Sequence, residues 1–147
     1  METANHEYYV SLEVAKLLKD AGFDWEVQSY YSKLSRMQGK LLWLSCGCKY
    51  KENINTNQNH YSAPTLDVAQ RWLREVKQLD ISIHYDPTIK SQPYVYFIYD
   101  VEEKFNDILG IISPVTHSYS DGYFYTYEEA QNTGIKKALE IILEKEK

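Results

Sequence analysis

The stretch from Thr65 to Leu73, "TLDVAQRWL", decides the fold because two other stretches share its pattern: "SLEVAKLLK" from Ser11 and "TYEEAQNTG" from Thr126. Each begins with Ser or Thr, has an acid at the third position and Ala at the fifth. A Ser or Thr side chain accepts from the free N–H groups of a first helical turn, and an acid there complements the helix dipole. Ala is the best helix former. The pattern therefore predicts that a helix begins at each of the three positions.

The residues that follow predict helices over 11–21, 65–79 and 126–145. Apolar side chains recur at helical spacing in the first two segments, and Gly22 predicts a left-handed stop after the first. In the third segment Ala130, Gly134 and Ala138 recur every four residues. Because Gly is unfavourable inside a helix by about 1 kcal/mol, a strip of such small residues indicates close packing against another element.

Between the helices, apolar and aromatic runs with period-two alternation predict strands. The expected strands are 25–33, 41–49, 81–85, 94–101, 108–112 and a hairpin over 117–126 that turns at Asp121-Gly122. The hairpin would pair Ser118 with Tyr125. We expect an α+β fold of one domain, 1–147, with a mainly antiparallel sheet of five to six strands and three helices packed on it. The polar, Asn-rich segment 50–64 is expected to be a mobile loop.

From Thr65 onwards, the order helix, strands, helix is similar to that of a double-stranded-RNA-binding domain. Such a domain begins its last helix with basic residues, whereas here the helix begins "TYEEAQ". The acidic start argues against that function.

Charge is unevenly distributed in the sequence. The whole chain carries a net charge of −5, but 26–51 has five basic residues and only Glu26 as an acid. Aromatic residues are interleaved with these basic ones, so phosphates could pair and bases could stack there. This segment is one candidate nucleic-acid or nucleotide site, and the alternative is an ordinary solvated hairpin tip. Its residues are Arg36, Lys40, Trp43, Lys49 and Lys51.

Tyrosine is abundant, with 14 residues in a chain of 147. Tyr suits half-buried strands, and it is also favoured at recognition surfaces. If the expected strands are neighbours, Tyr94, Tyr96, Tyr123 and Tyr125 would share one face of the sheet. That face is a candidate protein-binding surface unless a helix lies across it.

No catalytic or metal-binding motif is recognisable. Cys46 and Cys48 in "CGC" match zinc spacing poorly, and buried core cysteines are the favoured interpretation. His84 and His117 lie on expected strands without a nucleophile motif, so a small hydrolase is only a third hypothesis. No phosphate-cradling glycine loop is present. We therefore expect a protein with no catalytic residues, no metal and no cofactor.

The sequence has no run of 18 apolar residues and no secretory signal. Two cysteines are too few for a disulfide framework. A cytoplasmic protein is expected, without a membrane partner.

Three segments carry a resemblance to a known group: "VSLEVAKLLKDAGFDWE", "SAPTLDVAQRWLREVKQLDISI" and "YFYTYEEAQNTGIKKALEIILE". Together they resemble a set of small uncharacterised proteins encoded by phages and prophages of gut Bacteroidetes. The resemblance implies an accessory protein in the bacterial host cytoplasm, and it brings no catalytic residues. The first hypothesis is thus a non-enzymatic module that binds a host or phage protein, for instance in a defence system, and that can also self-associate. Nucleic-acid or nucleotide binding is the alternative.

Overall fold

The computed structural model describes residues 8–34, 36, 39–44, 51–100, 116–119 and 123–146. Within them it has three α-helices, which are α2 (Leu12–Asp20), α3 (Leu66–Val76) and α4 (Tyr127–Lys145). The strands are β1 (Ser29–Ser32), β2 (Leu42–Trp43), β3 (His60–Ser62), β4 (Leu79–Tyr85), β5 (Tyr94–Asp100) and β6 (Thr116–Tyr119), and Ile54–Thr56 forms a short 3-10 helix, η1. The α+β class is confirmed.

All three predicted helix starts are confirmed at the atomic level. The side chains of Ser11, Thr65 and Thr126 each accept a hydrogen bond from the backbone N–H three residues later. The predicted stop of α2 is also present, because Gly22 has φ +91° and the Phe23 N–H donates to the Leu18 carbonyl at 2.9 Å.

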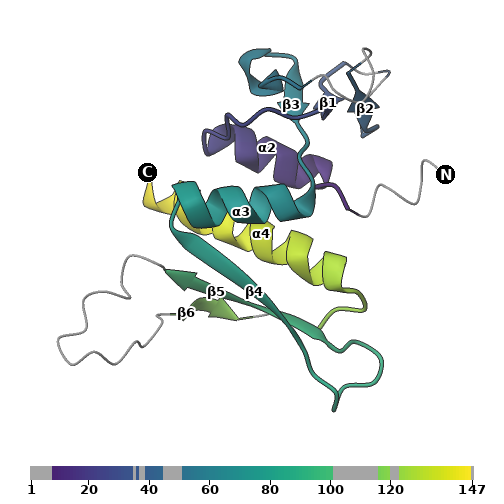
Figure 1. The fold of residues 1–147 in the computed structure, drawn as a ribbon, viewed down its shortest axis with the longest axis vertical. Coiled ribbons are helices and arrows are strands. Elements are labelled where there is room, and N and C mark those ends of the chain that lie inside the picture. The colour runs from purple at the N-terminus through teal and green to yellow at the C-terminus, as the bar shows by residue number, and fades with distance from the viewer. Residues whose placement is uncertain are drawn as a thin grey trace.

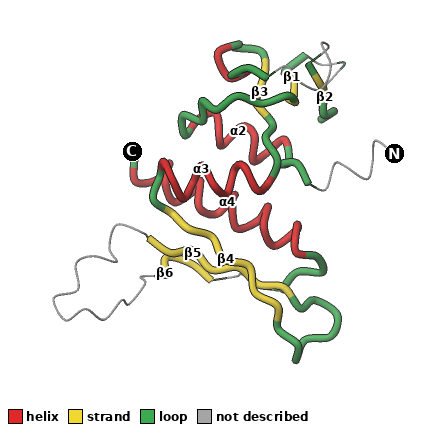
Figure 2. The backbone as a smooth tube through the Cα atoms, viewed as in Figure 1, coloured by secondary structure: helices red, strands yellow, loops and turns green. Residues whose placement is uncertain are grey.

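The expectation of one sheet with five to six strands is wrong for the described residues. They form two antiparallel sheets of three strands, in the orders β2-β1-β3 (the first sheet) and β4-β5-β6 (the second sheet). Figure 1 shows the helices between the two sheets, with α2 next to the first sheet and α3 and α4 on the second. The same layers are clear in Figure 2, where the strands lie on either side of the helices. In the chain, helix α3 connects the two sheets: it follows β3 of the first sheet and precedes β4 of the second.

The segment expected to be a mobile loop, 50–64, is ordered by its own polar side chains over the described part, 51–64. Asn55 donates from Nδ2 to the Phe23 carbonyl at 2.9 Å and accepts from the Ser62 N–H at 2.8 Å. Asn53 accepts from the N–H of Asn55 and begins η1. Asn-rich composition here supplies hydrogen bonds to backbone groups, and β3 results.

The predicted hairpin over 117–126 is also wrong in its pairing. Ser118 pairs with Ile98 and Phe124 pairs with Tyr94, so both lie along the same edge of β5, four β5 residues apart. A hairpin would instead place Tyr125 beside Ser118. The turn residues Asp121 and Gly122 lie outside the described residues, as does the predicted strand 108–112.

Helices α2, α3 and α4 run in the same direction, with their N-termini at one end of the molecule (Figure 1). Side-chain contacts join them in this register: Ser11 with Asn132, Asp67 with Gln131, and Lys77 with Glu146. Parallel helix dipoles repel each other at that end. Each first turn carries an acid, and these negative charges offset the repulsion.

The second sheet is covered closely by α4, as the small-residue strip predicts. A Cβ placed on Gly134 would lie 3.1 Å from the ring of Tyr96 and 3.1 Å from Cγ2 of Ile81. Ala130 and Ala138 are fully buried on either side of it. Helix α3 ends earlier than the sequence pattern indicates, because Gln78 has φ +60° and Leu79 begins β4.

Candidate functional site

The clearest surface feature is a group of three tyrosines where the β4–β5 connection meets the start of α4. The ring centroids of Tyr85 and Tyr94 are 5.5 Å apart, and those of Tyr94 and Tyr127 are 6.2 Å apart, both edge to face. Tyr85 is 62% exposed and Tyr127 is 42% exposed. We call Tyr85, Tyr94 and Tyr127 the tyrosine patch. Edge-to-face pairs hold the rings in defined positions, so the patch is a preformed surface.

Hydrogen bonds fix the backbone on both sides of the patch. Tyr94 and Phe124 exchange backbone hydrogen bonds of 3.1 and 2.8 Å. Beyond Tyr85, the carboxylate of Asp86 accepts from the N–H and the hydroxyl of Thr88 at 2.9 and 2.6 Å. The backbone beside Tyr94 is therefore held by a strand bridge, and the backbone after Tyr85 is held by a hydrogen-bonded turn.

The start of α4 is fixed as firmly. Glu129 donates its N–H to the Thr126 hydroxyl at 3.1 Å, and its carboxylate accepts from the Tyr125 N–H at 3.1 Å. The two bonds form a reciprocal cap in which the return bond comes from the residue before Thr126. It orients Tyr127 at the first helical position.

Acidic groups lie near the two exposed tyrosines of the patch. The pKa of Tyr127 is raised by burial first, and then by the charges of Asp67 and Glu128. Hydrogen bonds from the side chain and then the backbone of Thr88 lower the pKa of Asp86, so this carboxyl next to Tyr85 stays ionised. A phenolic surface with a negative rim favours a positively charged partner, because cations bind to aromatic faces and pair with carboxylates.

The predicted aromatic face is correct only in part, because Tyr96 is fully buried. Residues directly opposite in an antiparallel pair share a face, so Tyr94, Tyr96 and Phe124 all point to the helix side. Tyr96 lies beneath Gly134 of α4, while Tyr94 lies at the end of the strand and reaches the surface beyond the helix start.

Tyr123 and Tyr125 are exposed, at 43% and 62%, on either side of Phe124. Phe124 contacts Tyr96, with ring centroids 6.0 Å apart. The two flanking tyrosines thus border the tyrosine patch in the chain without sharing the face of Tyr94. Of the four predicted tyrosines, Tyr123 and Tyr125 are exposed, Tyr94 is half-buried and Tyr96 is fully buried.

The sequence did not single out Tyr85 and Tyr127, although both are central to the patch. A weak signal existed for each: Tyr85 precedes the turn pair Asp86-Pro87, and Tyr127 follows a helix cap. Residues at these positions stand at the ends of elements, where side chains extend past the core. Their contact with each other through Tyr94 depends on packing between α4 and β5, which no local pattern reveals.

The predicted basic segment lies only partly within the described residues. Arg36, Lys40 and Lys51 are exposed, and no hydrogen bond, ion pair or ring contact within the described ranges links them to each other. Trp43 is half exposed and packs edge-on against Tyr9, with ring centroids 5.1 Å apart. Lys49 lies outside the described residues.

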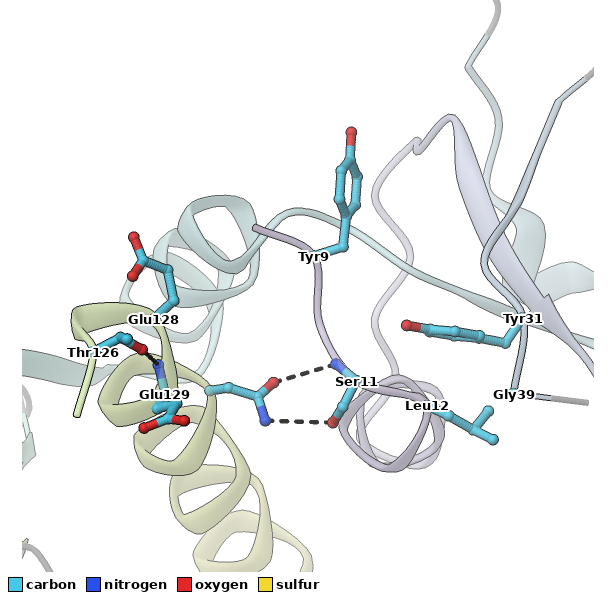
Figure 3. A pocket seen from close by; sticks show the side chains of 9 residues that line it. Tyr9, Ser11, Leu12, Tyr31, Gly39, Thr126, Glu128 and Glu129 are labelled. Atoms are coloured by element: carbon cyan, nitrogen blue, oxygen red, sulfur yellow. Dashed lines mark hydrogen bonds between the residues drawn. The ribbon is translucent and has the colours of Figure 1, made fainter. Parts of the chain in front are cut away.

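A cavity of about 450 Å³ opens between the starts of α2 and α4 (Figure 3). Its polar groups already serve the backbone: Ser11 and Asn132 bond to each other, and the Tyr31 hydroxyl donates to the Val10 carbonyl at 2.7 Å. Thr126 and Glu129 form the helix cap described above, and this bond is drawn in the same figure. Most polar groups that line this cavity therefore already make hydrogen bonds that hold the helix starts in place, and few are left for a ligand.

The hydrolase hypothesis gains one contact from the structure. Nε2 of His84 lies 2.8 Å from the Ser82 hydroxyl, and both are at the surface of β4. Within the described residues, no carboxylate bonds to the second ring nitrogen to orient it, and Asp80 on the same strand face lies 3.9 Å from Arg74 instead. The side chain of His117 lies outside the described part.

Two further possibilities are metal binding, for which the sequence offered Cys46 and Cys48, and a membrane span. Cys46 and Cys48 lie outside the described ranges. Inside those ranges, no three His, Cys, Asp or Glu side chains lie close enough to hold a metal ion. None of the described helices is both long and apolar enough to span a bilayer.

Comparisons with known proteins add no name to these observations, because no family model, curated protein or solved structure matches the chain.

Proposed function

We propose that the protein is a non-enzymatic binding module that recognises a basic surface of another protein through the tyrosine patch. One observation carries the proposal: the exposed rings of Tyr85 and Tyr127 both contact the half-buried ring of Tyr94, on a backbone fixed by a strand bridge and a helix cap. Tyr provides a large contact area with few rotatable bonds, which keeps the entropy cost of binding small.

The negative rim specifies the class of partner. Asp67, Asp86 and Glu128 border the patch, so Arg or Lys side chains would gain both ring contacts and charge pairing there. The resemblance of the sequence to phage and prophage proteins supports a host or phage protein as the partner, including a component of a defence system. Self-association is the other possible use of an exposed aromatic surface.

The test is affinity capture from bacterial lysate with three baits. The first bait is the natural protein and the second is Tyr85→Ala with Tyr127→Ala. The third carries two equally exposed changes elsewhere, Tyr8→Ala and Leu34→Ala, at side chains that are 54% and 58% exposed. A partner of the patch is captured by the first and third baits and is lost from the second.

The captured protein is then purified and titrated. We expect the patch variant to bind at least tenfold more weakly and the control variant to bind as the natural protein does, with affinity falling as salt is added. Equal capture by all three baits would remove the proposal. Sedimentation of the natural protein alone identifies self-association, which the same patch variant should abolish if the patch serves that purpose.

A further inference from the structure

Three lysines converge on a single tyrosine ring on the other side of the molecule. The ammonium nitrogens of Lys16, Lys19 and Lys33 lie 5.8, 5.3 and 5.3 Å from the ring centroid of Tyr61. Two of the lysines come from α2, one follows β1, and the ring belongs to β3. We call Lys16, Lys19, Lys33 and Tyr61 the lysine cluster. The protein has 16 basic residues against 21 acidic ones and a net charge of −5, so this grouping is not a by-product of a basic composition.

Lys19 has a structural role in the cluster. Its ammonium group donates to the carbonyls of Asn57 and His60 at 2.7 and 2.8 Å, and it thus ties α2 to the segment before β3. Burial lowers the pKa of Lys19 and the charge of Lys33 lowers it further, while Asp20 opposes them. The neighbouring positive charge is therefore unfavourable in the free protein.

The side chains of Lys16 and Lys33, in contrast to that of Lys19, make no structural hydrogen bond among the described residues. Both are exposed, and their ammonium groups have no hydrogen-bond acceptor or carboxylate partner among the described residues. Both ammonium groups lie against the Tyr61 ring and line the same hollow, so their donors are available to one ligand. An incoming anion would relieve the repulsion and complete their hydrogen bonds.

A small hollow marks where the anion would lie. It has a volume of about 90 Å³ and is lined by Lys16, Lys33, Tyr61, Ser32 and Leu12. The buried Ser32 hydroxyl accepts from the Leu34 N–H at 3.1 Å, which leaves its own proton able to donate. The hollow has room for a tetrahedral oxyanion beside the two ammonium groups.

We propose that the lysine cluster binds a phosphate group of a nucleotide or of a nucleic-acid strand. Lysine acts as a point charge on phosphate, whereas recognition of phosphorylated peptides relies on the planar fork of arginine. The cluster contains lysines alone, which favours the nucleotide source. The base would lie outside the hollow, so recognition is of phosphate and not of sequence.

Three probes separate the possible sources: inorganic pyrophosphate, ATP and a single-stranded oligonucleotide, each titrated at low salt. Binding of pyrophosphate and ATP alike assigns a free polyphosphate, and binding of the oligonucleotide alone assigns the backbone of a strand. The key variant is Lys16→Gln with Lys33→Gln, which leaves the structural Lys19 in place. The matched control is Lys40→Gln with Lys51→Gln, which removes the same charge from the basic segment.

We expect the key variant to weaken binding at least tenfold and to make the dependence of affinity on salt less steep by about one to two in the logarithmic slope. The control should change affinity by less than about threefold, which is the general effect of two distant charges. The double change Tyr85→Ala with Tyr127→Ala should have no effect, so this site is independent of the proposed protein-binding surface. Two results would overturn the inference: no binding of any of the three probes, or equal weakening in the key and control variants.

Discussion

The two sheets of this protein are stabilised in different ways. In the first sheet the strands have two to four residues, and side chains bind the backbone of neighbouring segments. Ser29, for example, donates its hydroxyl to the Ala63 carbonyl at 2.7 Å while being almost fully buried. In the second sheet β4 and β5 pair over seven residues each, and the buried side chains that meet α4 are Ile81, Tyr96 and Ile98. One sheet depends on individual hydrogen bonds, and the other depends on ladder length and apolar packing.

This difference separates the two candidate surfaces. On the helix-side face of the second sheet, packing against α3 and α4 uses the middle of β4 and β5, so the described aromatic residues of that face that reach the surface lie at the strand ends. Hydrogen bonding in the first sheet instead requires polar side chains such as Lys19 close to the strands. The tyrosine patch thus lies at the second sheet, which is stabilised by apolar packing. The lysine cluster lies at the first sheet, which is stabilised by side-chain hydrogen bonds.

The largest effect is expected for Tyr96→Ala in the second sheet. Removing a fully buried ring beneath α4 leaves a cavity, and aromatic-to-Ala changes in cores cost about 3–5 kcal/mol. Urea unfolding at neutral pH measures the loss. Tyr125→Ala, at a side chain that is 62% exposed, is the control and should stay within about 0.5 kcal/mol of the natural protein. A similar loss in both variants would contradict the burial assignment.

Overpacking at the same contact gives the next largest effect. Gly134→Val places a branched side chain where even a Cβ would lie 3.1 Å from Tyr96 and Ile81, and such crowding costs about 2–3 kcal/mol. Thermal unfolding measures it. Lys137→Val, three residues later on α4 and half-buried, is the control for a β-branched residue in a helix. Equal destabilisation by both changes would show that helix propensity and not packing is responsible.

The helices and their packing could be predicted because their causes are local. Ser11, Thr65 and Thr126 each act within one turn of their own helix, and the small-residue spacing around Gly134 is visible in a few residues. The division into two sheets was missed because strand pairing is set by α3 passing between them, which alternation cannot show. Segment 117–126 contains a strong turn signal, yet the edge of β5 pairs with both of its described ends.

The candidate sites likewise combine residues that the sequence could predict with residues that only the tertiary structure reveals. Tyr94 could be chosen from an aromatic strand, but its exposure depends on where α4 begins. Lys16, Lys33 and Tyr61 come from a helix, the end of a strand and the segment expected to be a loop, so their meeting is a property of tertiary structure alone. The basic segment stays a prediction from charge, because net charge in a stretch of sequence does not specify where side chains point and Lys49 lies outside the described residues.

A smaller effect is expected in the first sheet from Asn55→Ala. The change removes the acceptor of the Ser62 N–H and the donor to the Phe23 carbonyl, and each unsatisfied backbone group costs about 1 kcal/mol, for about 2 kcal/mol in all. Hydrogen exchange should show faster amide exchange in β3 and unchanged exchange in β4 and β5. Asn59→Ala, at an exposed side chain for which the described structure has no hydrogen bond, is the control. If exchange accelerates equally in both sheets, then they unfold as one unit and the contrast between them is lost.

The smallest effect, about 1 kcal/mol, is expected for Tyr31→Phe, which removes the bond from the hydroxyl to the Val10 carbonyl. This residue also predicts how the first sheet responds to alkali, because burial raises the pKa of Tyr31 to about 12. Below its ordinary pKa of about 10 the phenol is protonated in both the folded and the unfolded chain, so its full contribution to stability is present. As the pH rises from about 10 towards 12, the unfolded chain releases this proton and the folded chain keeps it, and stability is lost.

The variant separates Tyr31 from the other tyrosines, including Tyr9 and Tyr127, whose pKa values burial also raises. Urea unfolding of both proteins between pH 8 and pH 12 should show the natural protein losing more stability than Tyr31→Phe above about pH 10, because only the natural protein has this proton to release. Parallel pH profiles would mean that the Tyr31 hydroxyl is accessible to water. In that case the hydrogen bond between the Tyr31 hydroxyl and the Val10 carbonyl would stabilise the first sheet less than its length of 2.7 Å indicates.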